Sequence, residues 1–81
     1  MSNREKLKQL IIDVFLLNPD EFRFDLKQEE IETWDSLGVV SLAVGIRETF
    51  GYHLAAEEAV SIGGVADIMK ILKKKGIAFN G

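Results

Sequence analysis

Apolar residues recur at helical spacing near the start of the chain. Over residues 4–17 they fall three or four positions apart, with lysine, glutamine and aspartate between them. This spacing predicts a helix with one apolar face. Asn18-Pro19 marks its end, because proline disfavours helical geometry in the residue before it. The apolar face comprises Leu7, Leu10, Ile11, Val14 and Phe15.

Residues 36–50 repeat this pattern and predict a second helix. Asp35 or Ser36 can cap its start, and Gly51 suits its end because glycine readily adopts a left-handed conformation. Two glycines inside the segment each cost about 1 kcal/mol relative to alanine, so tertiary contacts must hold this helix. A glycine within a helix can also mark the close approach of another backbone.

The last third of the chain predicts one short helix and one longer helix. Residues 56–60 suit a single helical turn, and residues 65–75 carry an apolar side that Gly76 ends. The pattern does not decide whether the tail after Gly76 frays or folds back.

Residues 19–35 are the least regular segment, with five large apolar side chains scattered among acidic residues. Long loops in compact domains are usually functional or disordered, and these side chains favour a loop held on the core. Residues 21–26 alternate like a strand, but no partner strand is apparent elsewhere, so no sheet is expected.

Together these segments predict a small all-α fold, a four-helix bundle with three longer helices and one short helix. The long loop joins the first two helices. A chain of 81 residues is expected to form a single domain over residues 1–81, with its core at about residues 4–75 and a tail at residues 76–81.

The composition excludes several kinds of chemistry. The chain has no cysteine and one histidine, His53, which removes disulfides, thiolate metal sites and a cysteine nucleophile. No metal site is therefore expected. No run approaches the roughly 18 apolar residues of a membrane span, and the polar N-terminus lacks an apolar signal core. These features lead us to expect a cytoplasmic protein.

Negative charge is concentrated in the middle of the chain. The net charge is −3, but residues 13–58 contain eleven acidic and three basic residues. A segment this acidic argues against nucleic-acid binding and favours basic partners. The lysines within residues 70–75 come at the end of a predicted helix, where they complement the helix dipole.

The second predicted helix has two apolar faces. One comprises Val39, Leu42, Ala43, Ile46 and Phe50 and is the expected core face. Leu37, Val40 and Val44 form another stripe on the side that bears Glu48. Either the long loop or the short helix covers this stripe, or it stays exposed as a docking surface. Spacing alone does not decide between these alternatives.

The start of this helix resembles a known family. Residues 34–38 (Trp-Asp-Ser-Leu-Gly), residues 39–42 (Val-Val-Ser-Leu) and residues 50–51 (Phe-Gly) resemble the modification site and second helix of acyl carrier proteins. Residues 62–67 (Ile-Gly-Gly-Val-Ala-Asp) look like the start of the family's last helix. The resemblance covers roughly residues 5–75.

The resemblance implies a carrier protein rather than an enzyme. A phosphopantetheinyl transferase would move 4′-phosphopantetheine from coenzyme A onto Ser36, and the attached thiol would carry acyl groups as thioesters. Asp35 would contact the transferase or its metal ion, or only cap the helix. The implied partners are this transferase, an acyl-loading ligase or synthase and acyltransferases, acting on a monomer in a fatty-acid, polyketide or other acyl pathway. The implied partner-binding residues are Leu37, Val40, Val44 and Glu48.

One departure from the family pattern bears on the pathway. The second helix of typical fatty-acid carriers is rich in acidic residues, but here Gly38, Ser41 and Arg47 occupy such positions, and Glu48 is the only acid. The resemblance therefore implies a specialised carrier with its own loading enzyme more than service to a standard fatty-acid synthase.

Three alternatives remain at the level of sequence. A hydrolase pairing Ser36 with His53 is disfavoured, because no Gly-x-Ser-x-Gly turn surrounds any serine. A peptidyl or aminoacyl carrier would share the fold, the serine and the cofactor. An unmodified helical adaptor would bind a partner through Leu37, Val40 and Val44.

Overall fold

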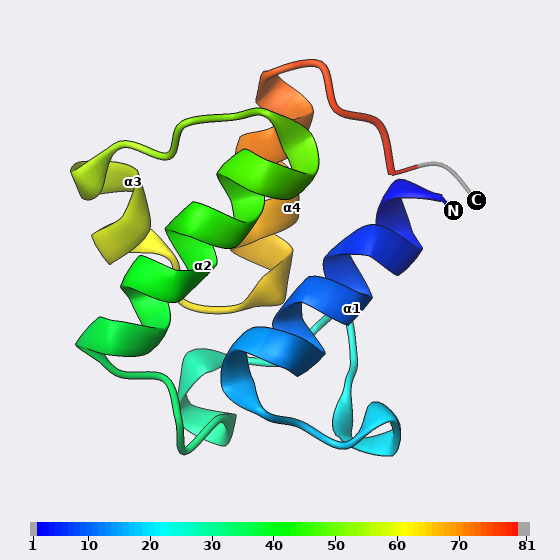
Figure 1. Ribbon diagram of the computed structural model, residues 1–81, viewed down its shortest axis with the longest axis vertical. Coiled ribbons are helices and arrows are strands. Elements are labelled where there is room, and N and C mark those ends of the chain that lie inside the picture. Colours follow the sequence, from blue (N-terminus) through cyan, green and yellow to red (C-terminus); the bar gives the residue numbers. More distant parts are fainter. Residues whose placement is uncertain (1, 80–81) are drawn as a thin grey trace.

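The chain folds into four helices joined by one long loop and two short connections (Figure 1). The computed structural model describes residues 2–79. Helix α1 spans Asn3–Phe15, α2 spans Ser36–Phe50, α3 spans Ala56–Ser61 and α4 spans Val65–Lys74. No strand is found in the described part of the chain. The predicted all-α fold with three longer helices and one short helix is confirmed.

Helix α1 ends two residues before the predicted limit of residue 17. Leu16 adopts a left-handed conformation, with φ 56° and ψ 45°, and its N–H donates to the Ile12 carbonyl. A left-handed leucine is disfavoured by about 1–2 kcal/mol, yet it ends the helix before Pro19 is reached. The expectation that proline ends this helix is therefore wrong. The predicted bounds of α2 are confirmed.

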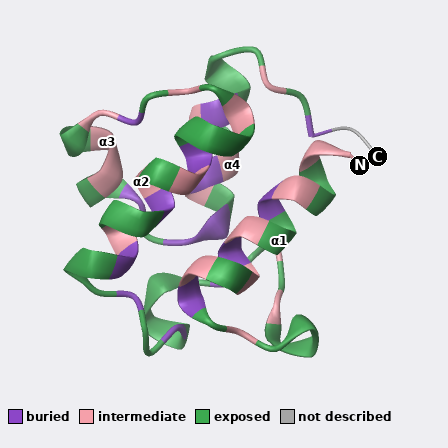
Figure 2. Ribbon diagram, viewed as in Figure 1, coloured by how far each residue is buried: buried purple, intermediate pink, exposed green. Residues whose placement is uncertain are grey.

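The core lies between the inward faces of α1, α2 and α4 (Figure 2). Leu42 and Ile46 of the expected core face are fully buried, while its other members are partly buried. Burial of side chains this size stabilises the fold by roughly 1.5–3 kcal/mol each. The largest fully buried side chains are Phe15, Leu7, Ile11, Leu42, Ile46, Ile68, Leu72 and Val65.

The long loop is held on the core, as expected. It contributes the buried side chains Leu26, Ile31 and Trp34, and it contains two short 3₁₀ turns that the sequence did not predict, Pro19–Glu21 and Gln28–Glu30.

Two backbone hydrogen bonds fasten this loop to the start of α4. The Gln28 N–H donates to the Gly63 carbonyl at 2.7 Å, and the Val65 N–H donates to the Leu26 carbonyl at 2.9 Å. Gly64 lies between these bonds, and a Cβ there would come within 2.7 Å of the Leu26 carbonyl oxygen. The glycine thus allows the two segments to meet without a sheet.

The C-terminal tail folds back instead of fraying. Phe79 is only 4% exposed and meets the Phe50 ring edge-on, with ring centroids 6.0 Å apart. The Asn3 side-chain amide donates to the Ala78 carbonyl at 2.8 Å, and Arg4 Nε donates to the Phe79 carbonyl at 3.0 Å. The core therefore extends past residue 75, the limit expected from the sequence. Residues 80 and 81 of the predicted tail lie outside the described residues.

The end of α1, the end of the loop and the start of α2 pack closely against one another. The Trp34 ring stacks on the Phe15 ring, with centroids 4.6 Å apart and planes inclined by 8°. The Thr33 hydroxyl donates to the Phe15 carbonyl at 2.7 Å. A Cβ on Gly38 would lie 2.8 Å from Phe15 Cε1 and 2.9 Å from the Thr33 carbonyl oxygen. Gly38 therefore marks a close approach, as its place inside a helix suggested.

We expect Gly38→Ala to destabilise the protein although alanine is the better helix former. The new methyl group would press on the Phe15 ring and on the Thr33 carbonyl, and the net loss should be about 1–2 kcal/mol in the free energy of unfolding. Urea unfolding followed by Trp34 fluorescence measures it. Ser41→Ala, an exposed position on the same helix, is the control. A Gly38→Ala protein more stable than wild type would contradict the close contact.

Candidate functional site

Ser36 is the first residue of α2, and its side chain is exposed. Asp35 precedes it in an extended conformation, and its Oδ1 accepts a hydrogen bond from the Gly38 N–H at 2.8 Å. Of the two possible caps, Asp35 is therefore the one used. The Ser36 hydroxyl makes no hydrogen bond to another group within residues 2–79. It is accessible to a reagent from outside.

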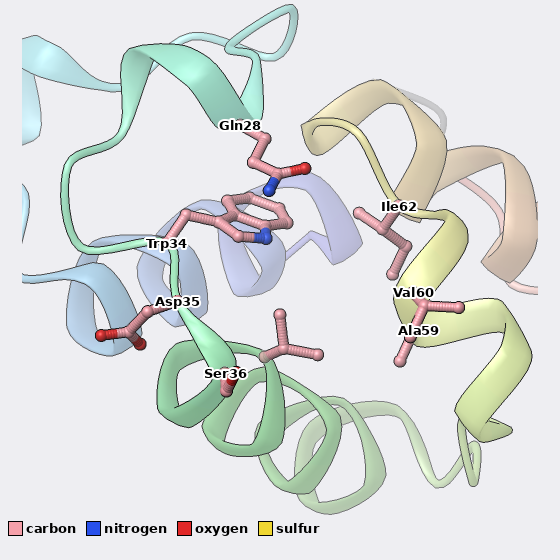
Figure 3. Close-up of a pocket in the computed structure, with 8 residues that line it drawn as sticks. Gln28, Trp34, Asp35, Ser36, Ala59, Val60 and Ile62 are labelled. Atoms are coloured by element: carbon pink, nitrogen blue, oxygen red, sulfur yellow. The ribbon is translucent and has the colours of Figure 1, made fainter.

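A pocket of about 510 Å³ opens beside Ser36 (Figure 3). Trp34 and Gln28 reach it from the loop, and Ala59 and Val60 form the opposite wall from α3. The walls are therefore mainly apolar, with one amide on the loop side. The full lining is Gln28, Trp34, Asp35, Ser36, Val39, Ala59, Val60 and Ile62.

The second apolar stripe of α2 is exposed. Leu37 is 78% exposed, Val40 is 61% exposed and Val44 is 51% exposed. Neither the long loop nor α3 covers them, so the alternative in which one of these segments buries the stripe is wrong. Glu48 is also exposed. These four side chains form a surface along α2 that begins next to Ser36.

Ser36 begins α2, whereas His53 lies beyond the other end of this helix. This helix has 15 residues, which span about 22 Å, and His53 follows its C-terminal end as an exposed residue. A serine–histidine pair requires contact between the two side chains. The structure therefore rules out that pairing.

Comparison with known proteins gives the family. The chain is 32% identical to an acyl carrier protein of Solidesulfovibrio magneticus over 75 residues, which cover 93% of this chain and 96% of the relative. It is 32% identical to an acyl carrier protein of Akkermansia muciniphila over 73 residues, covering 90% and 91% of the two chains. An acyl carrier protein of Bdellovibrio bacteriovorus is 28% identical over 78 residues, covering 96% and 100%. The chain belongs to the acyl carrier protein family. No family model matches it.

Membership of this family gives the protein the role of a carrier rather than an enzyme. Within residues 2–79, no helix is long and apolar enough to cross a membrane. The same residues contain no group of three or more acidic or histidine side chains that could hold a metal ion.

Helix α3 of this carrier is held by Glu58. The Glu58 carboxylate accepts hydrogen bonds from the Tyr52 hydroxyl and from the Ala55 N–H, the latter at 3.1 Å. These bonds lower the pKa of Glu58, and the nearby ammonium groups of Lys75 and Lys74 lower it further. The hydrogen bond to Glu58 also raises the pKa of Tyr52. Because α3 forms one wall of the pocket, this cluster positions that wall.

Sequence reasoning missed most of the pocket. Ala59, Val60 and Ile62 were assigned only to a short turn and a chain break, and Gln28 to an irregular loop. A six-residue helix has too little pattern to show which side faces a neighbour. Trp34 did carry a signal, because a large aromatic residue directly before the helix cap must pack near the start of the helix.

We expect Glu58→Gln to loosen α3 at neutral pH. The folded-state pKa of Glu58 lies below its usual range, so the ionised carboxylate stabilises the fold above the ordinary glutamate pKa and loses this effect as the pH falls through the lowered value. The difference in unfolding free energy between wild type and variant should therefore be present at pH 7 and shrink well below pH 4. Urea unfolding across this range measures it, and a pH-independent difference would contradict the prediction.

Proposed function

We propose that Ser36 carries 4′-phosphopantetheine in a phosphodiester bond and that the thiol of this group holds acyl intermediates as thioesters. The observation that carries the proposal is the exposed Ser36 hydroxyl at the start of α2, beside an open pocket, in a member of the acyl carrier protein family. The chain has no cysteine, so the attached group supplies the thiol that such a carrier needs.

The residues around Ser36 suit this group. The N-terminus of a helix favours a phosphate through its free N–H groups and its dipole, and Ser36 lies in the first turn of α2. The pocket next to it offers Trp34 and Ile62 as apolar walls and the Gln28 amide as a hydrogen-bonding group. An arm with a chain of methylene and amide groups matches walls of this mixed character.

Asp35 has a double role in this proposal. Its carboxylate holds the first turn of α2 by bonding the Gly38 N–H, which fixes the position of Ser36. Its side chain is exposed, so the remaining lone pairs can contact the transferase or the metal ion of the transferase.

We assign the exposed surface of Leu37, Val40, Val44 and Glu48 to partner docking. The proposed partners are a phosphopantetheinyl transferase, an acyl-loading ligase or synthase, and acyltransferases. An apolar stripe of this exposure next to the reacting residue is typical of a recognition surface. Because α2 carries a single acid, we favour a dedicated acyl pathway over a standard fatty-acid synthase. A monomer in the cytoplasm remains the prediction for its state and location.

The proposed function can be compared with two alternatives that the sequence left open. A peptidyl or aminoacyl carrier would use the same Ser36 chemistry with another cargo. An unmodified adaptor would need only the docking surface, and it would give no reason for a free serine hydroxyl at the edge of a pocket. We therefore favour the modified carrier.

We expect the apo protein to gain the mass of one phosphopantetheine when incubated with coenzyme A, magnesium and a broad-specificity transferase. Ser36→Ala should abolish the gain, because no hydroxyl remains to form the phosphodiester bond. Intact-protein mass spectrometry measures it. Ser41→Ala, which removes an exposed hydroxyl one turn and a half along the same helix, should leave the gain unchanged. No gain on the wild-type chain would favour the adaptor.

We expect Val40→Asp and Val44→Asp to weaken the transferase reaction without unfolding the protein. Both side chains are more than half exposed, so unfolding free energies should change by about 0.5 kcal/mol or less. Loss of apolar contact should lower kcat/KM about tenfold, which corresponds to about 1.4 kcal/mol. Ser41→Asp is the control, because it adds the same charge on the same side of α2. An equal loss in Ser41→Asp would assign the effect to charge instead of apolar contact.

A further inference from the structure

Leu16 is a large apolar residue that is exposed and lies outside the proposed docking surface. It is 81% exposed and adopts the left-handed conformation that ends α1. An isolated exposed leucine is ordinary on a protein surface. A left-handed one is unusual, because glycine or asparagine normally takes this place at the end of a helix. Folding alone does not account for leucine here.

An acidic hollow of about 270 Å³ adjoins Leu16. It lies between the end of α1 and the long loop, and Glu21, Glu30 and Glu32 contribute to its lining. Glu30 is paired with Arg23 at 2.7 Å. Glu21 accepts a hydrogen bond from the Asn18 N–H.

Glu32 is the uncompensated acid of this hollow. Its carboxylate has no ion pair or hydrogen bond within residues 2–79, and it is exposed. The hollow therefore presents net negative charge around an exposed leucine. A complementary surface would carry an apolar side chain flanked by lysine or arginine.

Two residues that line this hollow, Phe15 and Thr33, also lie against the start of α2. The Thr33 hydroxyl bonds the Phe15 carbonyl, and Gly38 touches the Phe15 ring. Each of these three contacting residues has an exposed neighbour in the sequence. Leu16 follows Phe15, Glu32 precedes Thr33 and Leu37 precedes Gly38. In Figure 1 the end of α1 and the start of α2 lie at the same end of the molecule. A partner that covers Ser36 and Leu37 thus has Glu32 and Leu16 within its reach.

We propose that Leu16, Glu21 and Glu32 form a second contact surface for the phosphopantetheinyl transferase that modifies Ser36, and that the transferase meets it with an apolar side chain flanked by basic residues. The inference rests on the proposed function. The docking site then has two parts, the stripe of α2 and the end of α1. The acids absent from α2 lie in the loop, where they serve the same partner.

The test is the steady-state modification of the full-length apo chain by a broad-specificity transferase with coenzyme A and magnesium. Leu16→Asn is the informative variant, because asparagine tolerates the left-handed conformation and removes only the apolar contact. We expect its KM for the carrier to rise at least fivefold with kcat within twofold. Glu32→Gln should raise KM two- to fivefold and flatten the increase of KM with salt.

Two matched variants serve as controls. Leu16→Met keeps an apolar side chain and should retain the wild-type KM. Glu5→Gln removes one charge from an exposed position in the first turn of α1, far from the hollow, and should also leave KM unchanged. Should Leu16→Asn fail to fold by circular dichroism, Glu32→Gln and its salt dependence decide the matter alone.

Several results would overturn the proposal. KM values within twofold of wild type for both Leu16→Asn and Glu32→Gln would do so, as would an equal effect of Glu5→Gln. Sedimentation showing a dimer that Leu16→Asn abolishes would assign this surface to a second copy of the chain. A wild-type chain that gains no mass would contradict the proposed function itself. A wild-type chain that is modified, with KM values unchanged in the variants, would contradict only this inference.

Discussion

The stacking of Trp34 on Phe15 is the contact on which the site depends. It ties the last residue of α1 to the last buried residue of the loop, and Gly38 lets the first turn of α2 close against the same ring. The position of Ser36 follows from these contacts, because it stands between Trp34 and Gly38 in the chain. The indole is also a wall of the pocket, so one side chain supports both the reacting residue and the space beside it.

Charge is divided between the two ends of the molecule. The acidic loop lies at the end where α1 finishes and α2 starts, while the lysines of α4 and Arg47 of α2 lie toward the opposite end (Figure 1). Such a separation gives the molecule a dipole that orients it as it approaches a charged partner. A partner with a basic surface would meet the Ser36 end first. The exposed stripe of α2 then supplies apolar contact once the encounter has occurred.

Local patterns predicted what depends on neighbours in the chain, and failed where distant segments meet. The limits of α2 followed from Asp35 and Gly51, and the buried Leu42 and Ile46 followed from helical spacing. Leu16 was placed inside a helix, although it lies on the opposite side from Leu7 and so carried a sign of exposure. Phe79 was left undecided, because its burial depends on α1 and on Phe50, far away in sequence. The pocket needs a wall from α3 whose position rests on the contact of Tyr52 with Glu58.

The hydrogen bond between Asn3 and Ala78 brings the two ends of the described chain side by side. In Figure 1 both ends lie far from the first turn of α2. A linker could therefore be fused before residue 2 or after residue 79 without crossing the face that carries Ser36. The same fold could work as a separate carrier protein or as one domain of a longer polypeptide. In both cases the end that carries Ser36 would stay accessible.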